Sequence, residues 1–283
     1  MKKNDTSLII YGYLSAIGAT IIWSGNFVVA RGLTDSIPPV SLAFWRWMVA
    51  IMIFMPFALK HLASDWGLIK SHLVYLIATS ILGVSLFNTL IYIAGHSTTA
   101  INLSLIAITF PVFIIILSRI FYGEVITINK WIGILLVVIG ILALITKGDW
   151  SILQKISFAK GDLWMLLAAL TFAVYSLLVK HKPAQLGAWS FQFATFVIGL
   201  LFLSPFYIWE SVTTDFQVQD IDSNTFYSIL YLGVFASLIA FILWAKAIHI
   251  VGPSKSSMIY YTLPIFSGLS AYLFLGEAIG VIH

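Results

Sequence analysis

Two stretches of this chain, PVFIIILSRIFYGE at 111–124 and PIFSGLSAYLFLGE at 264–277, share one pattern. Each begins with proline, continues through apolar residues and ends in glycine and glutamate, and each position of the second lies 153 residues after its counterpart. Upstream matches have offsets of 150 (Gly83 and Gly233) and 149 (Gly12 and Gly161). An offset that drifts slowly indicates an old tandem duplication with small insertions and deletions in the loops.

The composition places the duplicated chain in a membrane. Of its 283 residues, 60% are hydrophobic and 9% charged, and the mean hydropathy is +1.01. So few charges do not cover the surface of a soluble protein of this size. The pI near 9.2 does not indicate nucleic-acid binding, because the basic residues occur singly or in pairs between apolar runs. The chain has no cysteine, which excludes disulfide and thiol chemistry.

Nine apolar runs are long enough to cross a bilayer, which takes roughly 17–25 residues. They lack the alternation of membrane strands, so the sequence predicts an all-α membrane protein, a polytopic helical bundle. The first run is too long for a signal peptide and is interpreted as the first membrane helix. The runs are 8–30, 40–59, 72–94, 98–121, 128–146, 161–180, 188–209, 225–247 and 254–275.

Lysine and arginine positions predict the orientation of these spans. With the N-terminus in the cytoplasm, ten basic residues lie inside and four outside, and the acidic loop 210–224 lies outside. Five spans per repeat is an odd number, so the second half enters the membrane upside down relative to the first. The inside set is Lys2, Lys3, Lys60, Lys70, Arg119, Lys130, Lys180, Lys182, Lys246 and Lys255; the outside set is Arg31, Lys147, Lys155 and Lys160.

The expected organisation is therefore two inverted repeats, 1–148 with five helices and 149–283 with four. Glu124 is followed by six residues and then a strongly apolar helix, whereas Glu277 is followed by six residues and the end of the sequence. The tenth helix is thus expected to be absent, which leaves nine spans. The sequence leaves open a shortened chain and a nine-helix variant. Inverted repeats in a membrane protein are typical of transporters, in which two similar halves form gates around a central site.

The ordered motifs resemble those of the drug/metabolite transporter superfamily, most closely its EamA branch. The resemblance rests on the two proline-to-GE phrases, on Trp23-Ser24-Gly25-Asn26-Phe27 followed by Arg31, and on Pro38-Pro39 with Phe44-Trp45-Arg46-Trp47. It covers nearly the whole chain and fails only at the tenth helix. It implies export of small metabolites across the inner (cytoplasmic) membrane, and some relatives, the YddG-type exporters, move aromatic and other neutral amino acids.

Polar and aromatic residues inside the spans are the candidates for a central cavity, because polar groups in hydrocarbon usually face the protein interior. Trp23 and Asn26 lie on one helix face, and an offset of 149 maps them onto Phe172 and Tyr175. Helix–helix packing is the alternative interpretation. The remaining candidates for lining the path are Asn88, Tyr92, Asn102, Tyr260 and Tyr261. Trp45, Trp47 and Trp189 are expected to be interface anchors instead.

The sequence also predicts hinge or structural roles for two prolines, one arginine and two glutamates. Pro111 and Pro264 interrupt backbone hydrogen bonding and are predicted hinges or gates, with a static kink as the alternative. Arg46 is the one charge well inside a span; a structural role is favoured, and pairing with a substrate carboxylate is the alternative. Glu124 and Glu277 are expected to hold helix turns.

The absences in the sequence point away from other classes of protein. No carboxylate is expected in the middle of a span, so obligatory proton antiport is not expected, and a single core cation disfavours phosphate-bearing cargo. The spacing of histidine and acidic residues matches neither an intramembrane protease nor a metal site, so no enzyme, metal or cofactor is expected. The predicted function is alternating-access export of small, amino-acid-like metabolites by a monomer or homodimer embedded in lipid. A lipid-linked sugar carrier or flippase, or a multidrug exporter, is the alternative.

Overall fold

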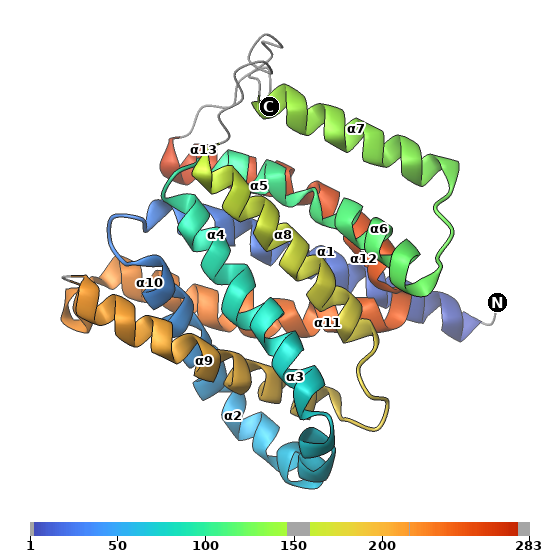
Figure 1. Ribbon diagram of the computed structural model, residues 1–283, viewed down its shortest axis with the longest axis horizontal. Coiled ribbons are helices and arrows are strands. Elements are labelled where there is room, and N and C mark those ends of the chain that lie inside the picture. Colours follow the sequence, from blue (N-terminus) through green and yellow to red (C-terminus); the bar gives the residue numbers. More distant parts are fainter. Residues whose placement is uncertain (1–2, 146–158, 215, 277–283) are drawn as a thin grey trace.

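The computed structural model describes residues 3–145, 159–214 and 216–276, and every regular element among them is a helix. Figure 1 shows long helices layered across one another, with the N-terminus and the end of the described chain on different sides. The elements are α1 (Lys3–Gly32), α2 (Pro39–Ser71), α3 (Leu73–Ser80), η1 (Ile81–Leu86), α4 (Phe87–Gly95), α5 (Ala100–Ala107), α6 (Phe110–Tyr122), α7 (Ile128–Ile145), α8 (Lys160–Lys180), α9 (Ala188–Thr213), η3 (Val218–Asp220), α10 (Ser223–Tyr231), η4 (Leu232–Ile239), α11 (Ala240–Val251), α12 (Pro253–Ile259), η5 (Tyr260–Thr262) and α13 (Leu263–Leu275).

The all-helical membrane fold predicted from the sequence is confirmed. Within the described residues, eight continuous helical stretches are long and apolar enough to cross a bilayer, and they correspond to eight of the nine expected spans. The ninth expected span, 128–146, is the helix α7, whose apolar stretch over Trp131–Gly140 is shorter. α7 lies at the edge of the bundle in Figure 1, where Ile134 packs on Val112 and Ile115 of α6.

The outer surface of the bundle is apolar, as a lipid solvent requires. Large hydrophobic side chains are exposed on the outward faces of several helices, among them Val74 at 83%, Leu201 at 65% and Phe206 at 62%. In water such patches would be exceptional, but lipid tails solvate them without penalty. The buried faces meet in one core that joins α1, α2, α4, α8, α9 and α11.

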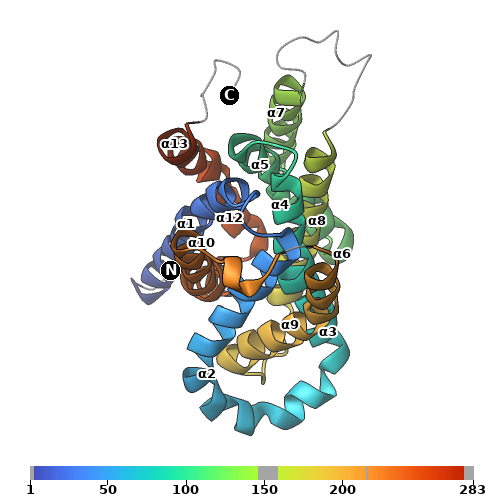
Figure 2. The ribbon, with the colours of Figure 1, turned by 90° about the vertical axis from the view of Figure 1, so that its left-hand side faces the viewer.

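The two halves carry the same irregularities at matching positions. The third span of each half contains a π-helical segment, η1 and η4, and the fourth span of each is broken immediately before its proline. Gly123 and Gly276 each end that fourth span at a φ of 66°, a left-handed conformation that glycine adopts without strain. In Figure 1, α1 and α8, the first spans of the two halves, run in opposite directions. In Figure 2, α13, α5 and α7 lie toward the top of the view and α2 and α9 toward the bottom, with α1, α4 and α8 between them.

Two sequence-based expectations need correction. Trp47 is not an interface anchor: it is fully buried, and its Nε1 donates to the Val84 carbonyl at 3.0 Å. Glu210 does not belong to an outer loop but to the last turn of α9, and it is 7% exposed. Its carboxylate accepts hydrogen bonds from the Val40 nitrogen and from both the nitrogen (2.6 Å) and the hydroxyl of Ser41. Glu210 therefore satisfies free N–H groups at the start of α2, a favourable place for an anion.

Candidate functional site

The centre of the bundle is filled by aromatic rings from six spans. The aromatic cluster consists of eight residues, each at most 4% exposed: Trp23, Phe87, Phe110, Phe172, Tyr175, Phe241, Trp244 and Tyr260. Phe172 lies in the middle, stacked on Phe87 with ring centroids 4.1 Å apart and edge-on to Trp23 at 5.2 Å. Such offset and edge-to-face pairs are the geometries that aromatic quadrupoles prefer.

Hydrogen bonds fix the two indoles of the aromatic cluster. Trp23 Nε1 donates to the carbonyl of Ala236 at 2.9 Å, which ties α1 to the π-helical segment η4. Trp244 Nε1 donates to the Ser176 hydroxyl at 3.0 Å, which ties α11 to α8. Both bonds join the first span of one half to the third span of the second half. The centre is therefore closed by specific contacts rather than by loosely packed side chains.

A second, polar cluster surrounds Arg46 of α2, which is fully buried. Its Nε donates to the Ser237 hydroxyl of η4 at 2.7 Å. Its Nη1 donates to Asn26 Oδ1 of α1 at 3.0 Å, to Asn88 Oδ1 of α4 at 2.8 Å and to the Tyr92 hydroxyl. The Tyr92 hydroxyl in turn donates to Asn26 Oδ1 at 3.0 Å. We call these five residues the arginine cluster; it joins four spans.

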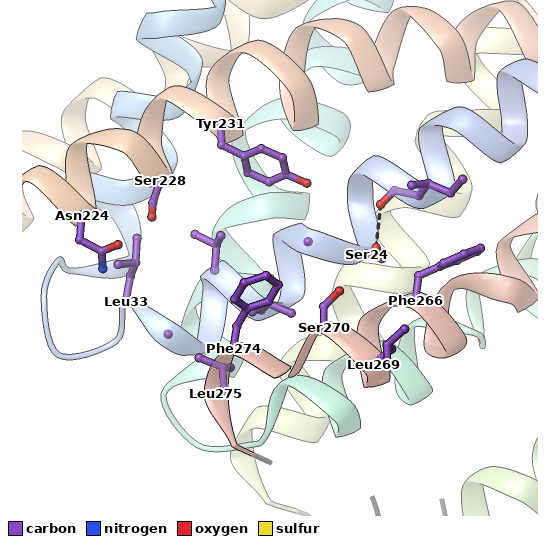
Figure 3. Close-up of a pocket in the computed structure, with 15 residues that line it drawn as sticks. Ser24, Leu33, Asn224, Ser228, Tyr231, Phe266, Leu269, Ser270, Phe274 and Leu275 are labelled. Atoms are coloured by element: carbon purple, nitrogen blue, oxygen red, sulfur yellow. Dashed lines mark hydrogen bonds between the residues drawn. The ribbon is translucent and has the colours of Figure 1, made fainter. Parts of the chain in front are cut away.

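Two pockets lie on opposite sides of these clusters. The far-side pocket, toward the end at which α1 finishes, has a volume of about 650 Å³ and lies between α1, α10 and α13. Figure 3 shows Tyr231 directing its hydroxyl toward α1, across from Phe266, Ser270 and Phe274. That hydroxyl donates to the Ile22 carbonyl at 2.6 Å, next to Trp23.

The N-side pocket lies toward the end at which α1 begins. It has a volume of about 520 Å³ and is lined by the end of α8, the start of α9 and the second half of α11. Its polar lining includes Lys182, Gln192, Lys246 and His249. Partial burial lowers the pKa of the Lys182 ammonium in the loop between α8 and α9. Phe54 of α2 also lines this pocket, and its ring centroid lies 6.2 Å from that of Phe196 in the core.

Seven of the nine predicted path-lining residues lie together in the two clusters. Trp23, Phe172, Tyr175 and Tyr260 belong to the aromatic cluster, and Asn26, Asn88 and Tyr92 to the arginine cluster. Asn102, in the first turn of α5, and Tyr261, in η5, are half-buried and lie outside both. The sequence predicts that these residues line an open cavity, whereas in the structure their aromatic rings contact one another.

Sequence reasoning missed five members of these clusters: Phe87, Phe110, Phe241, Trp244 and Ser237. Ser237 lies in the π-helical segment η4, as Ser85 lies in η1, although the offset of 150 between Gly83 and Gly233 aligns Ser85 with Phe235. Each hydroxyl bonds to the second span of the opposite half: Ser85 donates to the Gly199 carbonyl of α9 at 2.7 Å, and Ser237 accepts from Arg46 of α2.

The predicted hinges and glutamates have defined places. Pro111 and Pro264 each lie in the first turn of the second segment of a broken span, α6 and α13, where a missing N–H costs least. Glu124 accepts a hydrogen bond from the Ser254 hydroxyl at 2.8 Å, which connects the end of α6 to the start of α12. Glu277 lies outside the described residues.

The candidate site contains no cluster of metal-ligating side chains: among the described residues, no group of three or more His, Cys, Asp or Glu side chains comes together. What the geometry offers is a closed apolar centre, a buried cation with amide and hydroxyl neighbours, and a pocket on each side. This is the arrangement of a membrane carrier.

Comparisons with known proteins identify the family. The profile of the EamA-like transporter family matches residues 10–146 and again residues 159–283, so the chain belongs to that family and is a membrane transporter. Similar relatives include the uncharacterized transporter YyaM of Bacillus subtilis, 24% identical over 92% of this chain and 85% of its own length. An uncharacterized transporter of Archaeoglobus fulgidus is 25% identical over 91% of this chain and 86% of its own. YdfC of Bacillus subtilis, also called an uncharacterized transporter, is 26% identical over 98% of this chain and 86% of its own length.

A solved crystal structure shares the fold. It superposes with a TM-score of 0.67, covering 96% of this chain and 90% of its own at 16% sequence identity. At that identity the likeness extends to the arrangement of helices alone. None of these names specifies a cargo, so the cargo has to be argued from the site.

Proposed function

We propose that this chain exports small, neutral or aromatic, amino-acid-like metabolites by alternating access. The observation that carries the proposal is the closed aromatic cluster between two pockets on opposite sides of the bundle. Opening the contacts on one side at a time would connect the centre to one pocket while the other stays sealed. The proposal takes the N-terminus as cytoplasmic, the membrane as the inner membrane, and the two halves as inverted repeats that move against each other.

The matched irregularities of the two halves supply the means of motion. π-helical segments and helix breaks lack regular hydrogen bonding and are common at functional sites. Here they occur in the third and fourth spans of each half, beside the aromatic cluster. The breaks at Pro111 and Pro264 would act as hinges, because a proline at the start of a segment leaves the preceding turn without one restraining hydrogen bond.

The chemistry of the centre favours zwitterions with apolar or aromatic side chains. Rings supply a surface for an apolar side chain, while amides, hydroxyls and one guanidinium supply partners for its polar end. A pocket that is mostly apolar with a few polar groups is typical of sites for small organic molecules. A single buried cation does not suit nucleotide sugars, whose phosphates require several.

One observation supports an amphiphile carrier as the second candidate. The far-side pocket is bordered by side chains of α13 that face outward, with Leu269 at 55% and Phe274 at 78% exposure. A pocket that opens sideways toward lipid suits an acyl chain or a lipophilic drug better than it suits an amino acid.

The test is counterflow in liposomes containing the purified chain. Labelled phenylalanine, other amino acids and a lipid-linked sugar are compared, each with and without an imposed pH gradient. We expect saturable amino-acid counterflow without a gradient, reduced in Trp23→Ala and Tyr175→Ala at unchanged amounts of folded protein. Trp209→Ala is the matched control, since that ring is 67% exposed and lies outside the cluster and both pockets. Flux of the lipid-linked sugar alone would favour the second candidate, and a loss of folded protein that parallels the loss of flux would favour packing roles.

A further inference from the structure

The hydrogen bonds of Arg46 are unevenly distributed over its guanidinium. A guanidinium carries five N–H donors, two of them on each terminal nitrogen. Three acceptors converge on Nη1, one more than its two N–H groups can serve. Nη2 is fully buried and has no partner among the described residues. Two donors of a buried cation are therefore left without an acceptor.

Asn88, like Arg46, has buried N–H donors without an acceptor. Its Oδ1 accepts from Arg46, which fixes the orientation of the amide, and its Nδ2 is buried without a partner. Arg46 Nη2 and Asn88 Nδ2 together offer up to four N–H groups. What the cluster lacks is an acceptor, and the guanidinium also lacks a negative counter-charge: within the described chain its polar neighbours are hydroxyls and amides.

A purely structural arginine explains this arrangement poorly. Buried charges in proteins are usually paired, and unpaired buried donors are costly. An arginine that only joined helices would gain by directing Nη2 at an acceptor as well. Instead, its neutral neighbours hold Nε and Nη1 in place and leave one edge unsatisfied. This is how a receptor for an anion is pre-organised.

The arginine cluster adjoins the far-side pocket. Gly25 lines that pocket and precedes Asn26 of the arginine cluster. Tyr231 lines it too, lies within electrostatic range of the guanidinium, and presses its hydroxyl so close to Gly25 that an added Cβ there would lie 2.4 Å from it. Tyr231 thus lines the pocket and is near the arginine cluster, and Phe235, stacked on it at 5.9 Å, follows on the same helix.

We propose that Arg46, with Asn88, receives the carboxylate of the transported molecule, and that Tyr231 is the gate over it on the far side. The inference rests on the proposed function and narrows it to cargo that carries a carboxylate. A carboxylate would accept from both Nη2 and Nδ2, and it would neutralise the buried charge. The aromatic cluster would then hold the cargo's side chain. No covalent step is involved.

The experiment compares a carboxylate with matched molecules that lack it. Reconstituted protein is loaded with labelled phenylalanine, and counterflow is competed by phenylalanine, phenylalaninamide and phenethylamine. For the wild type we expect the acid to compete at least about tenfold better than the two analogues, since a hydrogen bond to a charged group is worth about that factor or more. In Arg46→Gln and Asn88→Leu this preference should fall toward one. Arg31→Gln removes an exposed cation at the end of α1 and should leave the preference unchanged.

The outcomes separate the two proposals. A wild type that moves no amino acid overturns the proposed function and this inference with it. A wild type that moves phenylalanine but is competed equally by its amide, or an Arg46→Gln variant that keeps the full preference, overturns the inference alone. If the Arg46 variants do not fold, thermal unfolding of the wild type decides. Phenylalanine should raise the melting temperature and phenylalaninamide should not, and equal shifts would contradict the carboxylate site.

Discussion

Gly83 gives the sharpest test of the closed centre. It lies in the π-helical segment η1 and packs directly against the ring of Tyr175: a Cβ added at position 83 would lie 2.3 Å from Tyr175 Cδ2 and 2.5 Å from Cε2. No real Cβ contact is that short, so Gly83→Ala must displace the ring or the helix. Overpacking of this kind costs about 1–3 kcal/mol. Elsewhere in a helix the same substitution is favourable by about 0.5–1 kcal/mol.

The assay is unfolding of the purified protein in detergent or bicelles. Gly83→Ala is compared with Gly67→Ala, an exposed position of α2 with no atom within 4 Å of the added Cβ. We expect opposite signs, with the first variant destabilised and the second unchanged or stabilised. Tyr175→Leu should relieve the clash, giving a coupling of about 0.5–3 kcal/mol between positions 83 and 175. Equal stabilities for the two alanine variants, or strictly additive effects with Tyr175→Leu, would refute the packing described here.

Three more predictions concern Glu210, His96 and the orientation of the chain in the membrane. Glu210→Ala should lower the free energy of unfolding by about 1–3 kcal/mol, because it leaves the Ser41 nitrogen and its neighbours at the start of α2 without an acceptor; an unchanged melting temperature would contradict the capping role. Burial lowers the pKa of His96 below its usual 6.5, so its contribution to stability is full above pH 6.5 and is lost as the pH falls through the folded value. His96→Gln should therefore reduce the difference in melting temperature between pH 7.5 and 5.5, and an identical difference would argue against it. With the N-terminus inside, an impermeant thiol reagent should label Ser223→Cys but not Ser64→Cys in intact cells, and the reverse pattern would invert the topology.

The spans were predictable because a bilayer imposes strong constraints on length and composition. The breaks before Pro111 and Pro264 and the left-handed Gly123 follow from the chemistry of those residue types. It also follows that Asn88 and Tyr92 both reach Arg46, since residues four apart share a helix face.

The periodicity of apolar residues in the sequence could not show which helix faces contact one another or how closely they pack. Trp47 has the sequence context of an interface anchor, but it is buried because α9 covers it with Phe196 at 4.7 Å. Trp244 and Phe241 look like ordinary apolar positions of a span, and only the approach of α11 to α1 and α8 brings them into the cluster. Likewise, the partners of Arg46 come from three other spans, a convergence that depends on tertiary packing rather than on local spacing.

The central claim is that the aromatic cluster separates two pockets that open in turn, and accessibility from each side tests it most directly. The chain has no cysteine of its own, so Ser270→Cys in the far-side pocket and Ala188→Cys in the N-side pocket are clean reporters. The account predicts that an impermeant thiol reagent reaches each from one side only, the two from opposite sides. It also predicts that adding cargo to one side raises labelling of one reporter while lowering that of the other. Labelling of both reporters from the same side, or labelling that cargo leaves unchanged, would contradict alternating access through this centre.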